Sequence, residues 1–473
     1  MPEGQSHRPK AADDRHFRSS ILVRARLLPS APRGGACPDP IDPRARADAW
    51  AARLDRALRA PRSDRKLHAL NGSQAATHQT MPLTPPSLTL GVEEEYLLVD
   101  PSSRDLVAAP PEGFMQRCQE RLGERVAHEL LQAQVEVGTT VCADVGAARA
   151  QLTALRATVA ATAREFGMAM IAASTHPFAS WRAQKKVEKE RYRMLARDMQ
   201  TLASRLVICG MHVHAGIEDE ELRIDLMNQA AYFLPHLLAL STSSPFWEGQ
   251  PTGLKAYRPT VFGNLPRSGL PEHFASAEEW RHMLLLLART GLCDDATKIW
   301  WDIRPSARFP TLELRICDIC TRLDDAITIA ALWQSILAML YRLRAGNQTW
   351  RRYRRTLVEE NKWLAQRHGV GAELADFGAL ARKPLGVLLE EIIELVRDEA
   401  MRLGCLPEVL RAREILDRGT SADQQLNVYT RAQAAGAGEH EAAQAVVDWL
   451  IAETMVGIAR DAAARTPAFD APP

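Results

Sequence analysis

The sequence has no apolar run of the roughly 18–20 residues that a membrane-spanning helix needs. Its nearest approach, residues 326–341, is interrupted by Gln334 and Ser335. An early apolar stretch at residues 21–23 ends at Arg24, which is too short for the core of a secretory signal. We therefore expect neither a membrane protein nor a secreted one.

Cysteine is scarce, with 8 scattered among 473 residues. In a chain of this length, scattered cysteines indicate free thiols in a reducing compartment, so we expect a cytoplasmic protein. Cys317 and Cys320 have C-x-x-C spacing, but no second ligand pair lies at zinc-finger distance. We interpret this pair as core residues.

The chain also lacks a large net charge of either sign, since its formal net charge is +1. The chain is nevertheless uneven, since residues 1–80 hold 15 Lys and Arg against 8 Asp and Glu. Residues 1–86 are rich in Arg, Pro and Ala with little periodicity, which predicts a mostly disordered extension. We expect one catalytic domain over residues 87–465, a flexible tail over 466–473, and no nucleic-acid or membrane partner.

The most informative segment present is Gly91-Val92-Glu93-Glu94-Glu95-Tyr96-Leu97-Leu98-Val99. It predicts a β-strand, on which Glu93 and Glu95 share one face while Glu94 faces the other way. Two carboxylates about 6.6 Å apart repel each other by roughly 2–3 kcal/mol at an effective dielectric near 20. A cation between them would relieve that repulsion, and so would solvent at an exposed sheet edge.

Four further segments show the same pattern of one apolar face and one polar face. They are residues 130–137, 207–216, 299–304 and 311–318. Their polar faces carry Gln132, Gln134 and Glu136; His212 and His214; Trp300, Asp302 and Arg304; and Glu313 and Arg315. Glu129 falls on the opposite parity unless a bulge intervenes. Covered by helices on its apolar side, such a sheet would gather these side chains on one concave surface.

Helical patterns of varied length separate these strands, with no regular βαβ repeat. Asp144 can cap a helix that runs to about residue 166. Further helices are expected near 185–204, 219–240, 276–291, 323–345, 349–368, 385–403, 406–418, 421–435 and 439–463. We therefore predict an α+β fold with a mainly antiparallel sheet and a long irregular stretch over 241–275.

Three chemistries compete for the polar face. Carboxylates can hold divalent metal ions and guanidinium groups can neutralise phosphate, which together favour nucleotide-dependent phosphoryl transfer. Because no Walker A or G-x-G-x-x-G sequence occurs, the nucleotide would have to lie on the sheet itself. His212-x-His214 is also compatible with a zinc hydrolase, although carboxylate excess favours a harder metal. A non-catalytic binding protein ranks last, because burying these charges costs stability.

At these residues the chain resembles the glutamate–cysteine ligase type 2 group of ATP-dependent carboxylate–amine ligases, which is more distantly similar to glutamine synthetase. The matching stretches appear in family order over roughly residues 87–460. They include GVEEEYLLVD at 91–100, QVEVGTTVC at 134–142, CGMHVHAG at 209–216, IWWDIRP at 299–305 and LELRICD at 312–318.

The resemblance implies a curved, mainly antiparallel half-barrel flanked by helices. It implies that ATP phosphorylates the side-chain carboxylate of glutamate and that an amine, typically cysteine, then attacks the acyl phosphate. Mg²⁺ would be the cofactor with Mn²⁺ as an alternative, and a homodimer is the suggested assembly. The implied metal ligands are Glu93, Glu95, Glu136, His212 and Glu313. Arg304 and Arg315 would act on phosphate, Lys189, Arg191 and His214 on the nucleotide, and Gln134, Arg258 and Trp300 on substrate.

Overall fold

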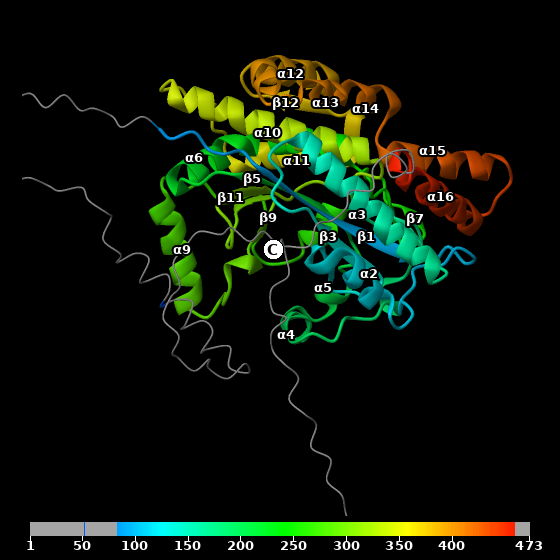
Figure 1. Cartoon of the computed structure of the whole chain (residues 1–473). Helices are drawn as coiled ribbons and strands as arrows, with labels where there is room; N and C mark the ends of the chain where they lie inside the picture. Colours follow the sequence, from blue (N-terminus) through cyan, green and yellow to red (C-terminus); the bar gives the residue numbers. More distant parts are fainter. Residues whose placement is uncertain (1–51, 53–82, 459–473) are drawn as a thin grey trace, which may run out of the picture.

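An antiparallel sheet of seven strands forms the centre of the structure, a computed structural model that describes residues 83–458 and residue 52 (Figure 1). The strands are β1 (Leu90–Val99), β2 (Val126–His128), β3 (Gln134–Gly138), β4 (Ala169–Ile171), β5 (Met211–Gly216), β10 (Ile303–Pro305) and β11 (Thr311–Leu314). Their order is β10-β11-β5-β1-β3-β2, and β4 pairs with the end of β1. This sheet and the flanking helices confirm the predicted α+β class.

The register between strands brings the polar side chains together. Across β1 and β5, Glu93 lies opposite His212. Across β5 and β11, His214 lies opposite Glu313, which in turn lies opposite Arg304 of β10. Because paired residues on antiparallel strands point to the same face, groups far apart in the sequence become neighbours.

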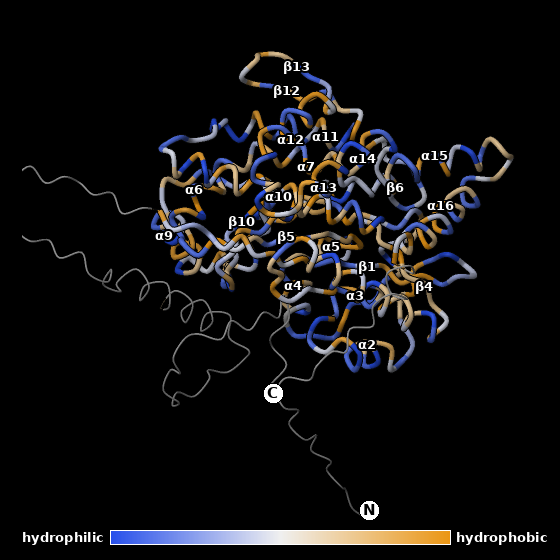
Figure 2. The backbone as a smooth tube through the Cα atoms, turned by 45° about the horizontal axis from the view of Figure 1, so that its top comes forward, coloured by the Kyte–Doolittle hydropathy of each residue, from blue (hydrophilic) through white to orange (hydrophobic). Residues whose placement is uncertain are grey.

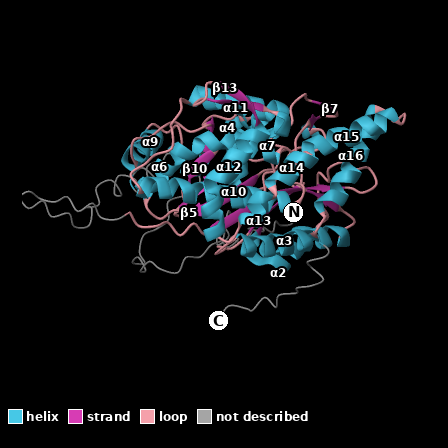
Figure 3. Cartoon of the chain, turned by 90° about the horizontal axis from the view of Figure 1, so that it is seen from above, coloured by secondary structure: helices cyan, strands magenta, loops and turns pink. Residues whose placement is uncertain are grey.

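The opposite face of the sheet is covered by two long helices, α3 (Val145–Glu165) and α10 (Leu323–Ala345), both of which contact β1. Asp144 caps α3 as predicted, since its side chain accepts a hydrogen bond from the backbone N–H of Ala147. Val92, Tyr96 and Leu98 are buried on this face. Figure 3 shows helices lying over the strands when the molecule is seen from above.

Helix α10 has the length and apolar composition of a membrane-spanning helix, but 83% of its most apolar window is buried inside the fold. Figure 2 shows it near the middle of the molecule. It packs against α3, α6, α7, α12 and α13. These contacts explain its apolar composition as that of a core helix.

The remaining helices surround the sheet and its polar side. They are α2 (Phe114–Leu122), α4 (Glu190–Met199), α5 (Thr201–Ser204), α6 (Glu220–Ala230), α7 (Leu234–Ser241), α8 (Arg258–Phe262), α9 (Ala277–Arg289), α11 (Arg355–His368), α12 (Leu385–Arg402), α13 (Leu406–Leu410), α14 (Ala412–Arg418), α15 (Ser421–Ala434) and α16 (Glu439–Thr454). The single helix expected at 185–204 begins only at Glu190 and is broken at Gln200, whose φ is 50°.

Short two-stranded sheets complete the described part of the fold. They pair β6 (Phe246–Trp247) with β7 (Gln250–Pro251), β8 (Ser268–Gly269) with β9 (Trp300–Trp301), and β12 (Glu373–Asp376) with β13 (Ala381–Pro384). The strand expected over 299–304 is therefore split at Asp302, and the strand expected over 130–137 is regular only from Gln134. The predicted extension up to residue 82 and the tail at 466–473 lie outside the described residues.

Candidate active site

A pocket of about 1340 Å³, including its open mouth, lies on the polar face of the sheet. Eleven of the thirteen predicted site residues line it, namely Glu93, Glu95, Gln134, Glu136, His212, His214, Arg258, Trp300, Arg304, Glu313 and Arg315. Five carboxyl groups and five Lys or Arg side chains occur in its wall. The convergence predicted from alternating strand faces is therefore present in the structure.

Of the two nucleotide contacts predicted at the start of α4, only Lys189 has a described side chain, and it is not among the residues that line the pocket. Tyr192 and Leu195 of this helix line the pocket, whereas Lys189 stands at the helix N-cap with its ammonium 5.9 Å from the centre of the Tyr192 ring. The side chain of Arg191 lies outside the described part of the chain. The roles predicted for Lys189 and Arg191 stay predictions.

One end of the pocket is organised around Glu93 and two histidines. His212 Nδ1 lies 2.9 Å from Glu93 Oε2, and His214 Nε2 lies 3.9 Å from the same oxygen. Burial alone would raise the pKa of Glu93, but the hydrogen bond from His212 and the nearby His214 imidazole outweigh it and lower the pKa to about 2. Burial and the charge of Arg315 lower the pKa of His212 to about 4. Near neutral pH the pair is thus a carboxylate and a neutral imidazole that donates to it.

Glu313 is the second carboxylate at this end, and two guanidinium groups hold it. Arg304 donates from Nε to Glu313 Oε2 at 2.9 Å and from Nη2 to Oε1 at 3.3 Å, while Arg315 contacts Oε1 directly. Arg304 is fixed in turn by the carbonyls of Thr297 and Ile299. Burial would raise the pKa of Glu313, but Arg304 and Arg315 keep it well below its usual value, so this carboxylate is ionised.

His214 completes a group that suits a divalent cation. Its Nδ1 lies 3.0 Å from Thr311 Oγ1, and its buried Nε2 finds no hydrogen-bond partner among the described residues. Ligand atoms of Glu93, His214 and Glu313 all lie within 4.8 Å of one another. A histidine that donates from Nδ1 presents its Nε2 lone pair, which is the arrangement found at protein metal sites. The orphaned nitrogen between two carboxylates therefore fits a metal ion.

This geometry differs from the expectation for the two histidines. His212 was predicted as a ligand and His214 as a nucleotide contact, but the group that fits a metal contains His214 and not His212. The antiparallel register places His214 opposite Glu313 and diagonal to Glu93, whereas His212 lies opposite Glu93 with its Nδ1 3.5 Å from Arg315 Nη1. His212 is thus placed to orient the Glu93 carboxylate.

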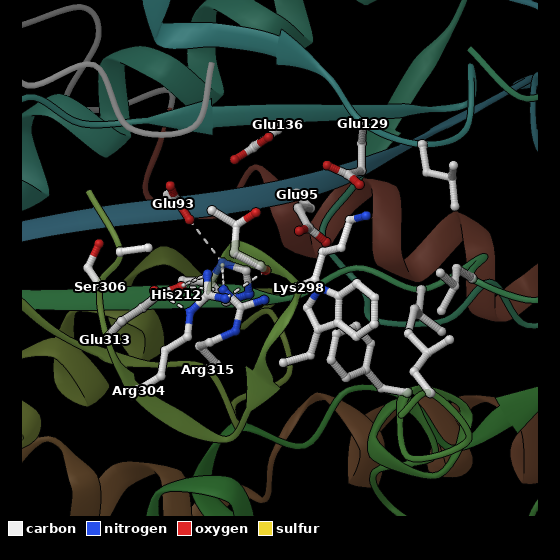
Figure 4. Close-up of a pocket in the computed structure, with 18 of the residues that line it drawn as sticks. Glu93, Glu95, Glu129, Glu136, His212, Lys298, Arg304, Ser306, Glu313 and Arg315 are labelled. Carbon is white, nitrogen blue, oxygen red and sulfur yellow. Dashed lines mark hydrogen bonds and ion pairs between the residues drawn. The ribbon is translucent and has the colours of Figure 1, made fainter. Parts of the chain in front are cut away.

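The other end of the pocket carries Glu95 and Glu129. Glu95 Oε2 accepts a hydrogen bond of 2.7 Å from the backbone N–H of Gly210. Burial, followed by the charge of Glu129, raises the pKa of Glu95 to about 8. In Figure 4 these two carboxyl groups lie near Lys298 and apart from Glu313 and Arg304. Glu95 is not part of the three-residue group, and its role as a metal ligand stays a prediction.

Glu129 was expected to point away from the polar face, but it lines the pocket. The chain between β2 and β3 leaves β geometry over residues 129–133, so the alternation of faces does not apply there. In the sequence, the only indication that Glu129 could reach the pocket was that a bulge would change the face on which it lies. Lys298 and the turn at Ser306 to Phe309 also line the pocket and were not predicted. The position of that turn between two polar-faced strands was an available signal.

Arg258 is held between the two ends by backbone contacts. Its Nη1 lies 3.3 Å from the carbonyl oxygen of Arg315 and 3.4 Å from that of Ile316. The backbone N–H groups of Arg258 and of its neighbour Tyr257 donate hydrogen bonds to Ser244 Oγ. The start of α8 is therefore anchored, and the guanidinium is presented to the pocket.

Asp318 supports that anchor and predicts a pH effect on stability. Its Oδ2 accepts hydrogen bonds from Ser243 N and Ser244 Oγ, and burial raises its pKa to about 6 although Arg258 acts in the opposite direction. The folded state thus binds this proton more tightly than the unfolded state, so about 3 kcal/mol of stability is present below pH 4 and is lost as pH rises through 6.

The Asp318→Asn variant should lack that pH dependence. Urea unfolding of wild type and variant at pH 4.5 and at 7.5 measures the difference in slope, so an overall loss of stability in the variant does not obscure the result. An unchanged pH slope in the variant would show that Asp318 is not the titrating group.

Similarity to known proteins agrees with the fold. Residues 89–448 match the profile of glutamate-cysteine ligase family 2. A Rhodospirillum rubrum protein named "Putative glutamate--cysteine ligase 2" is 55% identical over 386 residues, which are 81% of this chain and 99% of the relative. A Jannaschia protein of the same name is 51% identical over 370 residues, 78% of this chain and 97% of the relative.

Two solved structures share the fold at low sequence identity. A glutamate–cysteine ligase from Francisella tularensis in complex with AMP has a TM-score of 0.54 at 13% identity, covering 83% of this chain and 97% of that one. A bifunctional glutathione synthetase from Pasteurella multocida has a TM-score of 0.57 at 15% identity, covering 78% of this chain and 52% of that one. Together with the family match, these likenesses show that the chain belongs to glutamate–cysteine ligase family 2 and is an ATP-dependent ligase.

Proposed function

We propose that this protein joins the side-chain carboxylate of L-glutamate to an amine while ATP is hydrolysed to ADP and phosphate. Cysteine is the amine that the names of the relatives indicate, and γ-glutamylcysteine would then be the product. A ligase of the same type with a different amine acceptor is the alternative. The observation that carries this proposal is the pairing of Glu93, His214 and Glu313 with Arg304 and Arg315 in one pocket. Cation ligands and phosphate-binding groups meet there, as phosphoryl transfer requires.

The residues present fit Mg²⁺, with Mn²⁺ as the alternative, because two buried carboxylates dominate the donor set. Glu93, His214 and Glu313 would hold the ion, with Glu136 nearby on the neighbouring strand. When bound, the ion would neutralise negative charge on the phosphate groups of ATP. His212 would keep the Glu93 carboxylate oriented through the hydrogen bond from Nδ1.

Arg304 and Arg315 would stabilise the charge on the phosphoryl group in transfer. An oxygen of the glutamate side chain forms a bond to the γ-phosphorus of ATP, and the bond from that phosphorus to the leaving ADP oxygen breaks. Guanidinium groups fixed before reaction stabilise the developing charge without the cost of reorganisation. Arg258 would hold a substrate carboxylate, and Gln134 and Trp300 would contact substrate.

The zinc-hydrolase alternative loses its support in this geometry. It needed His212 and His214 as two ligands of one ion, whereas only His214 belongs to the group that fits a metal. The remaining proposals are nucleotide contacts from Lys189 and Arg191, small-molecule substrates as the partners, a homodimer, and a cytoplasmic location. His214, which was predicted as a nucleotide contact, is proposed here as a metal ligand instead.

A phosphate-release assay tests the proposed function. The full chain is incubated with ATP and Mg²⁺ across a panel of carboxylates and amines. Release that requires both L-glutamate and an amine supports the ligase. Hydrolysis of test esters or amides that needs no ATP and is stimulated by zinc would overturn it.

Gly210 is expected to control the position of Arg258. A Cβ added at Gly210 would lie 2.3 Å from Arg258 Nη2, so the guanidinium has to move in a Gly210→Ala variant. Because the displaced atoms are the end of a flexible side chain, the fold should survive while the KM for the amine substrate rises tenfold or more. Steady-state kinetics and thermal unfolding measure the two effects.

Gly371→Ala is the matched control, since nothing lies within 4 Å of the added Cβ. Its kinetic constants should equal those of the wild type. A Gly210→Ala variant with the wild-type KM would remove Arg258 from substrate binding.

Deleting residues 1–80 should leave the activity unchanged. The family match begins at residue 89, and the Rhodospirillum rubrum relative is covered over 99% of its length by 386 residues of this chain. We expect kcat/KM within twofold of the full chain, measured with the same phosphate assay. A collapse of expression or rate would show that the extension contributes to the working enzyme.

A further inference from the structure

The least polar part of the pocket is a wall at the end where Glu95 and Glu129 lie. It consists of Leu130, Tyr192, Leu195, Leu206 and Ile208, here called the apolar wall. Leu130 and Ile208 are buried, whereas the other three side chains are only partly buried. The wall therefore presents apolar surface to whatever occupies the pocket.

Contacts fix this wall to the carboxylate end. Tyr192 Oη donates to the carbonyl oxygen of His128 at 2.9 Å, next to Glu129 and Leu130 in the chain. The backbone N–H of Val187 donates to the carbonyl oxygen of Leu130 at 2.9 Å. These contacts hold the segment around α4 against the connection that carries Glu129.

Hydrogen-bond acceptors border the apolar wall. Gln134 is 1% exposed, and its Nε2 donates to the carbonyl oxygen of Ile208 at 2.7 Å. Its buried Oε1 has no hydrogen-bond partner among the described residues. The carboxyl groups of Glu95 and Glu129 lie at the same end and away from Ser306 and Arg304 (Figure 4). The buried Gln134 Oε1 can therefore accept a hydrogen bond from an ammonium or amine group beside the apolar wall.

We propose that the apolar wall is the side-chain subsite for the amine, and that it selects an α-amino acid with a large apolar side chain over cysteine. The inference rests on the proposed ligase function. Arg258, whose charge acts on Glu95, would take the α-carboxylate, and Gln134 Oε1 would accept from the α-amino group. A larger apolar side chain would bury more of this wall than cysteine does, and each additional buried methylene is worth about fourfold in binding.

The transfer of the glutamyl acyl group from phosphate to the amine needs no further reactant. The free-base amine nitrogen forms a bond to the acyl carbon, and the bond from that carbon to the phosphate oxygen breaks. The electron pair leaves with the phosphate, which takes the proton that the nitrogen loses. The product is an amide that carries the apolar side chain.

A panel of amine substrates tests the proposal with the full chain, ATP, Mg²⁺ and saturating L-glutamate. The kcat/KM for alanine, cysteine, leucine, methionine and phenylalanine is measured by ADP release, and each amide product is identified by mass. We expect leucine or methionine to exceed alanine at least thirtyfold and cysteine at least tenfold. Cysteine as the best substrate would overturn the inference and leave the ligase function intact. No glutamate-dependent ADP release with any amine would overturn both.

Leu195→Ala provides a second test within the wall. The kcat/KM for leucine should fall about tenfold while that for alanine falls less than threefold, because only the larger side chain reaches residue 195. Leu202→Ala in α5 is the matched control, since Leu202 is partly exposed and is not among the residues that line the pocket. It should not change the ratio of the two constants. Equal losses for both substrates in Leu195→Ala would overturn the assignment of the wall.

Discussion

Replacing Glu93 with Gln should abolish turnover, with a loss of at least a thousandfold, while the fold remains intact. The substitution removes the negative charge that faces His214 and keeps an oxygen that can accept from His212 Nδ1. Because the pKa of Glu93 is about 2, the wild-type residue is charged at every practical pH, so the loss should not depend on pH. Charge-neutral variants of metal-holding carboxylates remove both the ligand charge and its effect on the phosphate.

Three measurements check this expectation. ADP formation gives the rate, thermal unfolding gives the stability, and Mn²⁺ titration followed by electron paramagnetic resonance gives the affinity for the metal. Glu120→Gln serves as a control, because Glu120 lies on α2 and its side chain is 49% exposed. Wild-type turnover in Glu93→Gln would remove Glu93 from the active site, together with the proposed metal group.

The Arg156→Met variant should lose about 3–5 kcal/mol of unfolding free energy, since it leaves a buried carboxylate without its partner. Arg156 and Glu94 are both completely buried. Arg156 donates from Nε to Glu94 Oε2 at 2.8 Å and from Nη2 to Oε1 at 2.5 Å. It also donates to the carbonyl oxygens of Thr321 and Cys320, and Tyr96 Oη donates to Glu94 at 2.6 Å.

A double variant distinguishes the cost of an unpaired charge from the loss of packing. Arg156→Met combined with Glu94→Gln removes both charges, so most of the lost stability should return. Urea unfolding measures the two variants and each single change. A loss below 1 kcal/mol in Arg156→Met would show that Glu94 is protonated or hydrated once its partner is gone.

Sequence reasoning was most accurate where the strands are regular. Residues 91–99 and 211–216 form unbroken antiparallel strands, so alternation alone predicts that Glu93, Glu95, His212 and His214 reach one pocket. The polar class of the site and the α+β fold followed from the same pattern. Glu94 was expected to face the other way, and there it forms the buried pair with Arg156.

Other features depended on geometry that a pattern of residues does not contain. Glu129 reaches the pocket because its segment is not a strand, and the split at Asp302 arises because β9 pairs with β8 while β10 pairs with β11. The hairpin of β12 and β13 is short and largely exposed, so it carries no apolar alternation. The different neighbours of His212 and His214 depend on how β1, β5 and β11 are aligned with one another. That alignment cannot be read from the residue pattern of a single strand.

The three consecutive glutamates of β1 have a consequence for how the strand can pair. A shift of one residue would turn Glu93 or Glu95 towards Arg156 and bring Glu94 into the pocket, since alternate positions exchange faces. Arg156 could pair with any one of the three, but either shift would also move a second glutamate to the buried place of Val92 or Tyr96. The space behind the sheet thus accepts one acid with its guanidinium partner, and this limit determines which two acids the pocket receives.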